Sequence, residues 1–258
     1  MPDVLTERHD HVLLVTLNRP ERMNSIGGTL LRELSEALTE AELDREIRVV
    51  LLTGAGRGFC SGLDLKEVAA RGAGVGSGAA LPSIADTPPL LMRRLDTPIL
   101  CAMNGPAAGY GMDLALGCDL LLVSDRARFV PPIRRGVLPE SGGTWLLPRL
   151  VGWQKACEIA LLGRELEAAE IERLGLANRV VPHDRLMDEA MDWARTIAGS
   201  PPLAVAATKR SMRFGLDATF EANAAHVMAE LMQLFQSADF AEGLASFLEK
   251  RPPRFEGR

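Results

Sequence analysis

The sequence has few of the residues that build metal centres, disulfide frameworks or membrane spans. Its 258 residues include four cysteines and four histidines, and no two cysteines form a C-x-x-C pair. We therefore expect no metal site and expect the cysteines to be buried, reduced thiols. No apolar run reaches the ~18–20 residues that cross a bilayer. The N-terminal segment lacks the basic-then-apolar order of a signal peptide, so we expect a cytoplasmic protein with no membrane partner.

An excess of positive charge is also missing. The chain has 29 Lys+Arg against 34 Asp+Glu, a net charge of −5. This charge argues against a protein that coats nucleic acid through general electrostatic attraction. Apolar residues make up 47% and charged residues 24%, an ordinary globular composition that excludes disordered and collagen-like chains. At ~150 residues per domain, the length indicates one large domain or one domain with an appendage.

Short apolar runs alternate with helical patterns in the first part of the chain. Apolar residues at helical spacing predict an amphipathic helix over 29–44. Because the runs are apolar on both faces, they indicate strands of a parallel sheet covered by helices. The predicted strands span 12–17, 48–53, 98–103 and 119–123.

The pattern changes near residue 200. Residues 1–199 are predicted to form the core, and 71–80, rich in glycine and alanine, are predicted as a mobile loop. Residues 200–258 show no strand signal and are predicted as a helical region. This region is too short for a large core of its own, so it is expected to pack on the first region or on another subunit.

Two predicted strands run into glycine-rich loops that end on the same Gly-x-Asp-Leu pattern. The loops span 54–65 and 104–114. Glycine lets a backbone come close to a ligand, and two amides from adjacent loops could bind one oxygen as an oxyanion hole. The glycine spacing fits neither a dinucleotide fingerprint nor a P-loop, and there is no G-x-S-x-G nucleophile elbow. On glycine content alone, simple tight turns remain an equal alternative.

A series of short motifs keeps one order along the chain. It comprises Asn18-Arg19-Pro20, Asn24-Ser25, Gly58 to Leu65, Asn104-Gly105, Gly109 to Asp113, Cys118-Asp119 and Gly142-Gly143-Thr144. In order and spacing, the series resembles the crotonase superfamily, the enoyl-CoA hydratase/isomerase family, from Leu13 to Phe255. The resemblance implies an α/β fold of ClpP/crotonase type, a spiral of ββα units with a C-terminal helical trimerisation region. It also implies an acyl-CoA substrate, no cofactor, and assembly into homotrimers or hexamers.

The resemblance further implies chemistry through a thioester enolate. Negative charge on the thioester oxygen would be bound by the backbone amides of Leu63 and Tyr110, whatever their side chains. The phenol of Tyr110 could in addition line the acyl pocket. Asp113 falls where family hydratases carry their first catalytic glutamate, but it is one methylene shorter. Its alternative role is to complement the charge of a helix N-terminus.

The second family glutamate is missing from its expected place. The run at 129–136 is one residue shorter than the family pattern, and Ile133 or a gap stands at the glutamate position. Glu140, in the turn at 138–144, is the nearest replacement and the second catalytic candidate, with a surface charge as the alternative.

Basic residues are expected to bind the CoA phosphates. Arg22 and Arg57 match family positions near these phosphates, and arginine can bind phosphate through two hydrogen bonds. Lys250 resembles a C-terminal cation that can reach the nucleotide. The path of adenine and pantetheine is expected along Ser61, Gly62 and Asp64, although Asp64 could instead brace its loop.

These expectations predict an enoyl-CoA hydratase or isomerase. The alternatives are an acyl-CoA-binding protein with little activity, or another reaction on the same scaffold: thioester hydrolysis, decarboxylation or ring cleavage. A ClpP-like serine peptidase would share the architecture, but its nucleophile motif is not seen.

Overall fold

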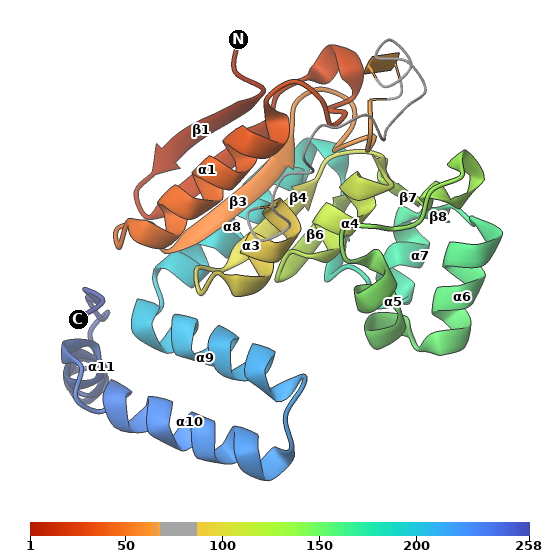
Figure 1. Cartoon of the computed structure of the whole chain (residues 1–258). Helices are drawn as coiled ribbons and strands as arrows, with labels where there is room; N and C mark the ends of the chain where they lie inside the picture. Colours follow the sequence, from red (N-terminus) through yellow and green to blue (C-terminus); the bar gives the residue numbers. More distant parts are fainter. Residues whose placement is uncertain (65, 68–86) are drawn as a thin grey trace.

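A six-stranded sheet forms the centre of the molecule (Figure 1). The computed structural model describes residues 1–64, 66–67 and 87–258, and the predicted loop at 71–80 lies outside them. The strands are β1 (Val4–His9), β2 (Val12–Leu17), β3 (Val49–Gly54), β4 (Ile99–Met103), β6 (Leu120–Ser124) and β9 (Arg179–Val181), and they lie side by side in this order. β1 runs antiparallel to β2, and the other neighbours run parallel.

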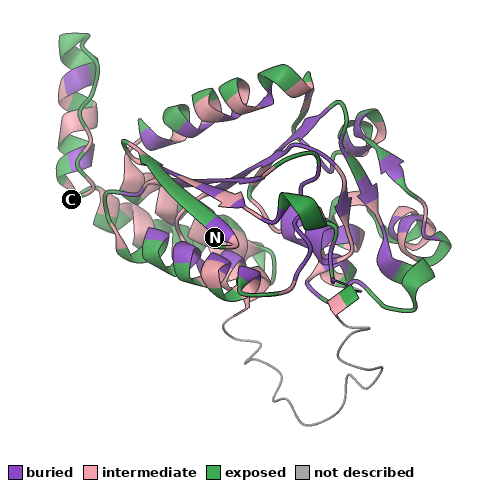
Figure 2. Ribbon diagram, turned by 90° about the horizontal axis from the view of Figure 1, so that it is seen from above, coloured by how far each residue is buried: buried purple, intermediate pink, exposed green. Residues whose placement is uncertain are grey.

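The four predicted strands and the predicted helix are confirmed. Each strand begins and ends within one residue of its prediction, and α1 (Leu30–Leu43) occupies the predicted helical range. β3 is buried at every position. Its Val50 and Leu52 pack in the core beneath α1, whereas Val49 and Leu51 pack with α8 (Leu186–Ala198). Figure 2 shows the buried strands between helices on both sides, as expected of a parallel sheet.

A second, small sheet lies beside the first. It contains β5 (Ala107–Ala108), β7 (Arg128–Val130) and β8 (Leu166–Glu167). The chain passes from β4 to β5 and through α4 (Tyr110–Leu116) to β6, and it then enters the small sheet again at β7. This alternation of strand, strand and helix is the predicted spiral of ββα units. α4 is buried along its whole length.

The remaining short elements surround the small sheet and the strand ends. The helices are α3 (Pro88–Arg94), α5 (Gly143–Val151), α6 (Trp153–Leu162) and α7 (Ala168–Arg173), and the 3-10 helices are η1 (Pro20–Arg22), η3 (Pro132–Arg135) and η4 (His183–Arg185).

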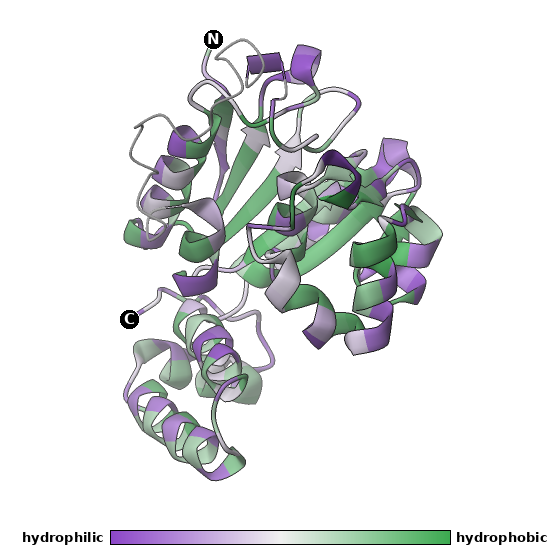
Figure 3. Cartoon of the chain, turned by 45° about the vertical axis from the view of Figure 1, so that its right-hand side comes forward, coloured by the Kyte–Doolittle hydropathy of each residue, from purple (hydrophilic) through white to green (hydrophobic). Residues whose placement is uncertain are grey.

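The C-terminal region is helical, as predicted. It consists of α9 (Pro202–Gly215), α10 (Phe220–Leu234) and α11 (Ala238–Glu249), and it extends away from the sheet (Figures 1 and 3). Ion pairs from α9 attach it to the core: Arg213 lies 2.7 Å from Asp96, and Lys209 lies 2.6 Å from Asp119. No residue of α10 is buried.

The cysteines are free thiols, but the prediction that all are buried is wrong for two of them. Cys60 and Cys101 are buried, whereas Cys118 and Cys157 are partly exposed. None of the helices within the described residues combines the length and the apolar character needed to cross a membrane.

Candidate active site

The two glycine-rich loops lie next to each other because they follow neighbouring parallel strands. β3 pairs with β4, so the loops that leave their carboxyl ends start at the same edge of the sheet. A bridge joins Cys60 to Ala107, and the Ala108 amide donates to the Cys60 carbonyl at 2.9 Å. Gly62 has a φ of +77°, and a Cβ there would lie only 2.7 Å from the Ala108 oxygen. Glycine is therefore needed for this close approach.

Two buried or nearly buried asparagines of the motif series hold the first loop in place. Asn24 Nδ2 donates to the carbonyls of Ala55 and Gly58, both at 2.9 Å. Asn104, which begins the second loop, donates to the Gly56 carbonyl at 2.9 Å. These side chains satisfy carbonyls that no strand partner reaches, which explains why a loop of this length keeps one shape.

The Leu63 amide is left free by the pairing around it. The Ile26 amide donates to Gly62 O at 2.7 Å, and the Asp64 amide donates to Ile26 O at 2.9 Å. These bonds use the groups on either side of Leu63, and in the described part of the chain the Leu63 amide has no acceptor.

The Tyr110 amide is free because Tyr110 begins α4. The first amides of a helix have no partner within that helix. The neighbouring Gly109 amide donates to Val130 O at 3.0 Å, but among the described residues the Tyr110 amide has no acceptor. A Cβ on Gly62 would lie 3.5 Å from Tyr110 N, so the two loops meet at these amides.

Leu63 and Tyr110 both line one cavity of about 700 Å³. This volume suits a small-molecule site. Four parts of the chain line it. The first three are 21–23 with 25, 61–64 with 66, and 108–110. The fourth consists of Pro132, Arg135, Gly136, Val137, Leu138 and Glu140, which we call the 132–140 wall.

The two candidate carboxylates occupy different environments. Asp113 is only 1% exposed and is not among the residues that line the cavity. Its Oδ2 accepts a hydrogen bond from the Ser141 amide at 3.0 Å. Burial raises the pKa of Asp113 to about 6, the amides of Ser141 and Gly143 act against this rise, and the charge of Glu140 adds to it.

Glu140 is exposed and lines the cavity. It lies in the turn before α5, between Pro139 and Ser141. Because Asp113 accepts hydrogen bonds from the amides that follow Glu140, Asp113 fixes the turn from behind while Glu140 faces the cavity. The structure therefore brings the two carboxylates together in one unit but exposes only Glu140 to a ligand.

Tyr110 contributes its side chain as well as its amide. Its hydroxyl is buried and has no hydrogen-bond partner among the described residues. Burial raises the pKa of this phenol well above its ordinary value, so the hydroxyl stays protonated.

The predicted CoA residues separate into two groups. Arg22, Ser61, Gly62 and Asp64 line the cavity. Asp64 is also held by its loop, since Oδ2 accepts from Ser25 Oγ at 3.0 Å and lies 3.4 Å from Arg22 Nη1. Both earlier interpretations of Asp64 thus find support in its position.

Arg57 and Lys250 lie outside the cavity lining. The Arg57 Nε donates to the Met23 sulfur at 3.1 Å. Lys250 follows α11 in the helical region that extends away from the sheet (Figure 1). Contact of these two cations with CoA stays a prediction.

Comparison with known proteins decides the family. The model of the enoyl-CoA hydratase/isomerase family matches residues 7–258. The chain belongs to the enoyl-CoA hydratase/isomerase family. It is 37% identical to the 1,2-epoxyphenylacetyl-CoA isomerase of Escherichia coli over the full length of both chains, and 42% identical to a probable enoyl-CoA hydratase of Mycobacterium bovis over 93% of this chain and 88% of the relative. The enoyl-CoA hydratase of Bacillus anthracis has the same fold, with a TM-score of 0.90 at 32% identity over the whole of both chains.

Membership confirms the resemblance stated above, the crotonase fold and an acyl-CoA-processing enzyme. Family hydratases carry their second catalytic glutamate at the position where this chain has η3. Here Pro132 lines the cavity, and Ile133 is 38% exposed and lies against Gly163. No carboxylate replaces the glutamate within this 3-10 helix.

Sequence reasoning missed several residues of the cavity. Lys66 and Arg135 bring cations to it, and Val137 and Leu138 bring exposed apolar side chains. The signal for Arg135 was the spacing from Pro132, because residues three apart share one side of a 3-10 helix.

The backbone of Gly62 offers a direct test of the oxyanion hole. Gly62→Ala is expected to lower kcat by about 10²–10³-fold, the usual cost of losing one oxyanion donor. The new Cβ would clash with the Ala108 oxygen, and the backbone shift that relieves the clash would move the adjacent Leu63 amide. Gly152→Ala is the matched control: its φ is also +77°, but no atom lies within 4 Å of the added Cβ. Steady-state rates of both folded variants measure the difference, and an unchanged kcat in Gly62→Ala contradicts the assignment.

Proposed function

We propose that this enzyme moves the double bond of an enoyl-CoA, with Glu140 as the single acid and base. The supporting observation is that Glu140 lines the same cavity as Leu63 and Tyr110, whose amides have no acceptor among the described residues, while Asp113 is buried and is not part of the lining. Of the other carboxylates in the lining, Asp64 is engaged by Ser25 and Arg22, and Glu21 lies in η1 beside Arg22.

The proposed reaction transfers one proton between two carbons. Glu140 removes a proton from the α- or γ-carbon, and the electron pair of that C–H bond moves through the conjugated system onto the thioester oxygen. The amides of Leu63 and Tyr110 stabilise the charge that develops there. Protonated Glu140 returns the proton to the other end, so the product has the mass of the substrate. The thioester itself accepts the electron pair, and no cofactor is needed.

Hydration fits the geometry less well. Splitting a water between two carboxylates needs two such groups facing the substrate. Asp113 would have to release the Ser141 amide to take part. The names of the relatives include both reaction types: one is the 1,2-epoxyphenylacetyl-CoA isomerase, named for an epoxide substrate, and another, at 35% identity, is the 2,3-dehydroadipyl-CoA hydratase of Escherichia coli.

Mass and absorbance together distinguish the two reactions. The enzyme is incubated with 3-hexenoyl-CoA and with 2-hexenoyl-CoA, and the products are examined by mass spectrometry and by the absorbance of the conjugated thioester. We expect the conjugated absorbance to appear from 3-hexenoyl-CoA with no change in mass. A product heavier by one water, formed faster than any isomer, contradicts the proposal.

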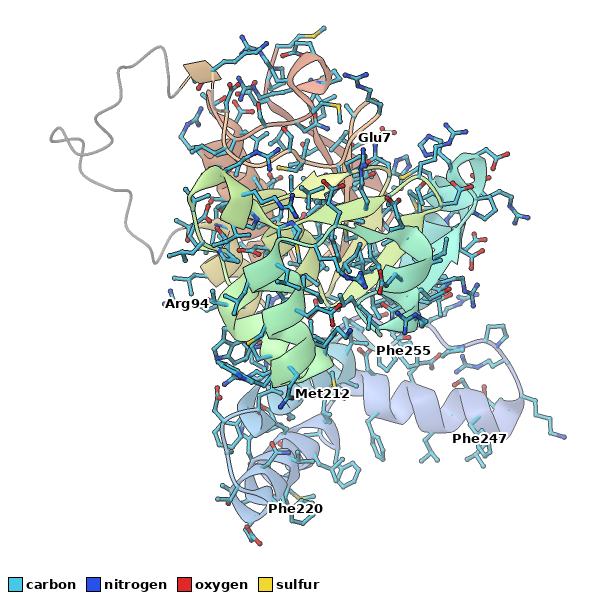
Figure 4. The ribbon with its side chains drawn as sticks, turned by 90° about the vertical axis from the view of Figure 1, so that its right-hand side faces the viewer. Glu7, Arg94, Met212, Phe220, Phe247 and Phe255 are labelled. Carbon is cyan, nitrogen blue, oxygen red and sulfur yellow. The ribbon has the colours of Figure 1, made fainter. Side chains whose placement is uncertain are left out.

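We also propose that the enzyme assembles as a homotrimer or a dimer of trimers and acts in the cytoplasm. The support for assembly is the apolar surface of the helical region, where Phe220 is 83%, Phe247 80% and Leu248 70% exposed. Figure 4 shows Phe220 and Phe247 on helices away from the core. Exposed apolar surface of this extent is typical of subunit contacts.

Light scattering tests the assembly. The wild type is expected at three or six times the chain mass of 27.9 kDa, and Phe247→Lys is expected to shift the mass downward. Leu43→Lys, which changes an equally exposed leucine on α1, is the control. A wild type that elutes as a single chain at micromolar concentration contradicts the proposal.

A further inference from the structure

Arg135 is directed into the cavity by the geometry of η3. In a 3-10 helix, residues three apart lie on one side, and Pro132 and Arg135 both line the cavity. The intervening residues turn the other way. Arg134 Nη2 donates to the Leu162 carbonyl at 3.4 Å, and Ile133 lies against Gly163. Arg135 is therefore part of the cavity lining, whereas its neighbour Arg134 belongs to the contact with α6.

No acidic side chain among the described residues forms an ion pair with Arg135, although Glu140 belongs to the same wall. Arg22, the other arginine of the lining, is paired with Asp64 at 3.4 Å. An arginine keeps its charge at any physiological pH, and its planar donors match a carboxylate. Arg135 thus offers an unused anion-binding group.

The surroundings of Arg135 indicate which anion it meets. Val137 and Leu138 follow it along the 132–140 wall and are 48% and 59% exposed. Glu140, the proposed acid and base, ends the same wall. In sequence these two apolar residues separate Arg135 from Glu140, and all four residues line the cavity. The complementary acyl group is an apolar chain with an anionic end.

We propose that Arg135 binds a carboxylate at the far end of the acyl chain, so that the enzyme prefers dicarboxylic acyl-CoA substrates. This inference rests on the proposed function only in that the acyl group must lie along the wall that carries Glu140. The other source of negative charge is CoA itself. Its phosphates have candidate partners elsewhere in the lining, at Arg22 and Lys66.

Binding measurements with unreactive ligands test the inference independently of catalysis. Dissociation constants are measured by calorimetry for glutaryl-, adipyl- and suberyl-CoA, each paired with the neutral saturated acyl-CoA of equal chain length. We expect the wild type to bind the carboxylated member of at least one pair about ten-fold more tightly, the size of one charge-assisted interaction in a partly exposed site. Arg135→Met is expected to abolish this preference, and Arg135→Lys to retain part of it.

Arg134→Met is the matched control, because it removes the neighbouring guanidinium, which lies outside the cavity. This variant is expected to keep the wild-type ratio of the two dissociation constants in each pair. The inference is overturned if the wild type shows no preference in any pair. It is also overturned if Arg135→Met weakens the binding of both members of each pair by the same factor, which would assign Arg135 to the CoA phosphates. Since no turnover is measured, a failure of the isomerase reaction leaves this result readable.

Discussion

Replacing Glu140 by glutamine is expected to lower kcat for double-bond isomerisation by about 10²–10⁴-fold, the contribution typical of a positioned acid–base group. Glutamine keeps the size and polarity of the side chain but cannot take up the proton. Because Glu140 is exposed, the folded structure should tolerate the change. The measurement is the steady-state rate on 3-hexenoyl-CoA, together with the thermal unfolding temperature of the variant.

Glu165→Gln provides a comparison for the loss of a carboxylate elsewhere. Glu165 lies outside the cavity lining and makes a surface pair with Arg128 at 3.3 Å, a type of contact that contributes little to stability. Its rate should match the wild type. A Glu140→Gln enzyme that isomerises at the wild-type rate would remove Glu140 from the mechanism.

Asp113→Ala is expected to destabilise the protein by about 2–4 kcal/mol, because it leaves the buried amides of Ser141 and Gly143 without an acceptor. The turn that carries Glu140 then loses its support, so kcat should fall as well. Chemical unfolding measures the first effect, and the rate on 3-hexenoyl-CoA measures the second. An alanine variant as stable and as active as the wild type would contradict the positioning role.

The pH dependence of the unfolding free energy provides a separate test of the raised pKa of Asp113. Its pKa is about 6 in the folded protein against an ordinary value of 3.8, so the folded state holds the proton more tightly. The stability that this proton contributes is fully present below pH 3.8 and is lost as the pH rises through about 6. Between these two pH values, the free energy of unfolding of the wild type should therefore fall by about 3 kcal/mol relative to that of Asp113→Asn, which cannot ionise. Parallel stability curves for the two proteins would contradict this environment for Asp113.

The asparagine variant also separates positioning from catalysis. It keeps an oxygen that can accept from the Ser141 amide, although its NH₂ group faces the Gly143 amide. We expect a rate about ten-fold below the wild type, a smaller loss than in Glu140→Gln. A folded Asp113→Asn protein with a loss as large as Glu140→Gln would make Asp113 a catalytic group, as the family position first indicated.

Much of the fold followed from local patterns. The strands β2, β3, β4 and β6 and the helix α1 were predicted because uninterrupted apolar runs and helical spacing report burial directly. The motif series identified the family, and several of its residues meet local requirements of the backbone. Asn24 and Asn104 satisfy loop carbonyls, and Gly62 permits a close approach that a Cβ would prevent.

The roles of the polar residues depended on contacts between distant segments. Sequence position made Asp113 the first catalytic candidate, but its burial and its bond to Ser141 arise only when α4 packs beneath the turn before α5. Arg135 is next to another arginine in sequence, and the pitch of η3 decides which of them reaches the cavity. Apolar runs and helical spacing thus predicted four strands of the large sheet and one covering helix, and the resemblance of the motif series indicated the family. Only the tertiary structure decided which carboxylate meets a ligand, because solvent exposure and hydrogen-bond partners are set by residues far away along the chain.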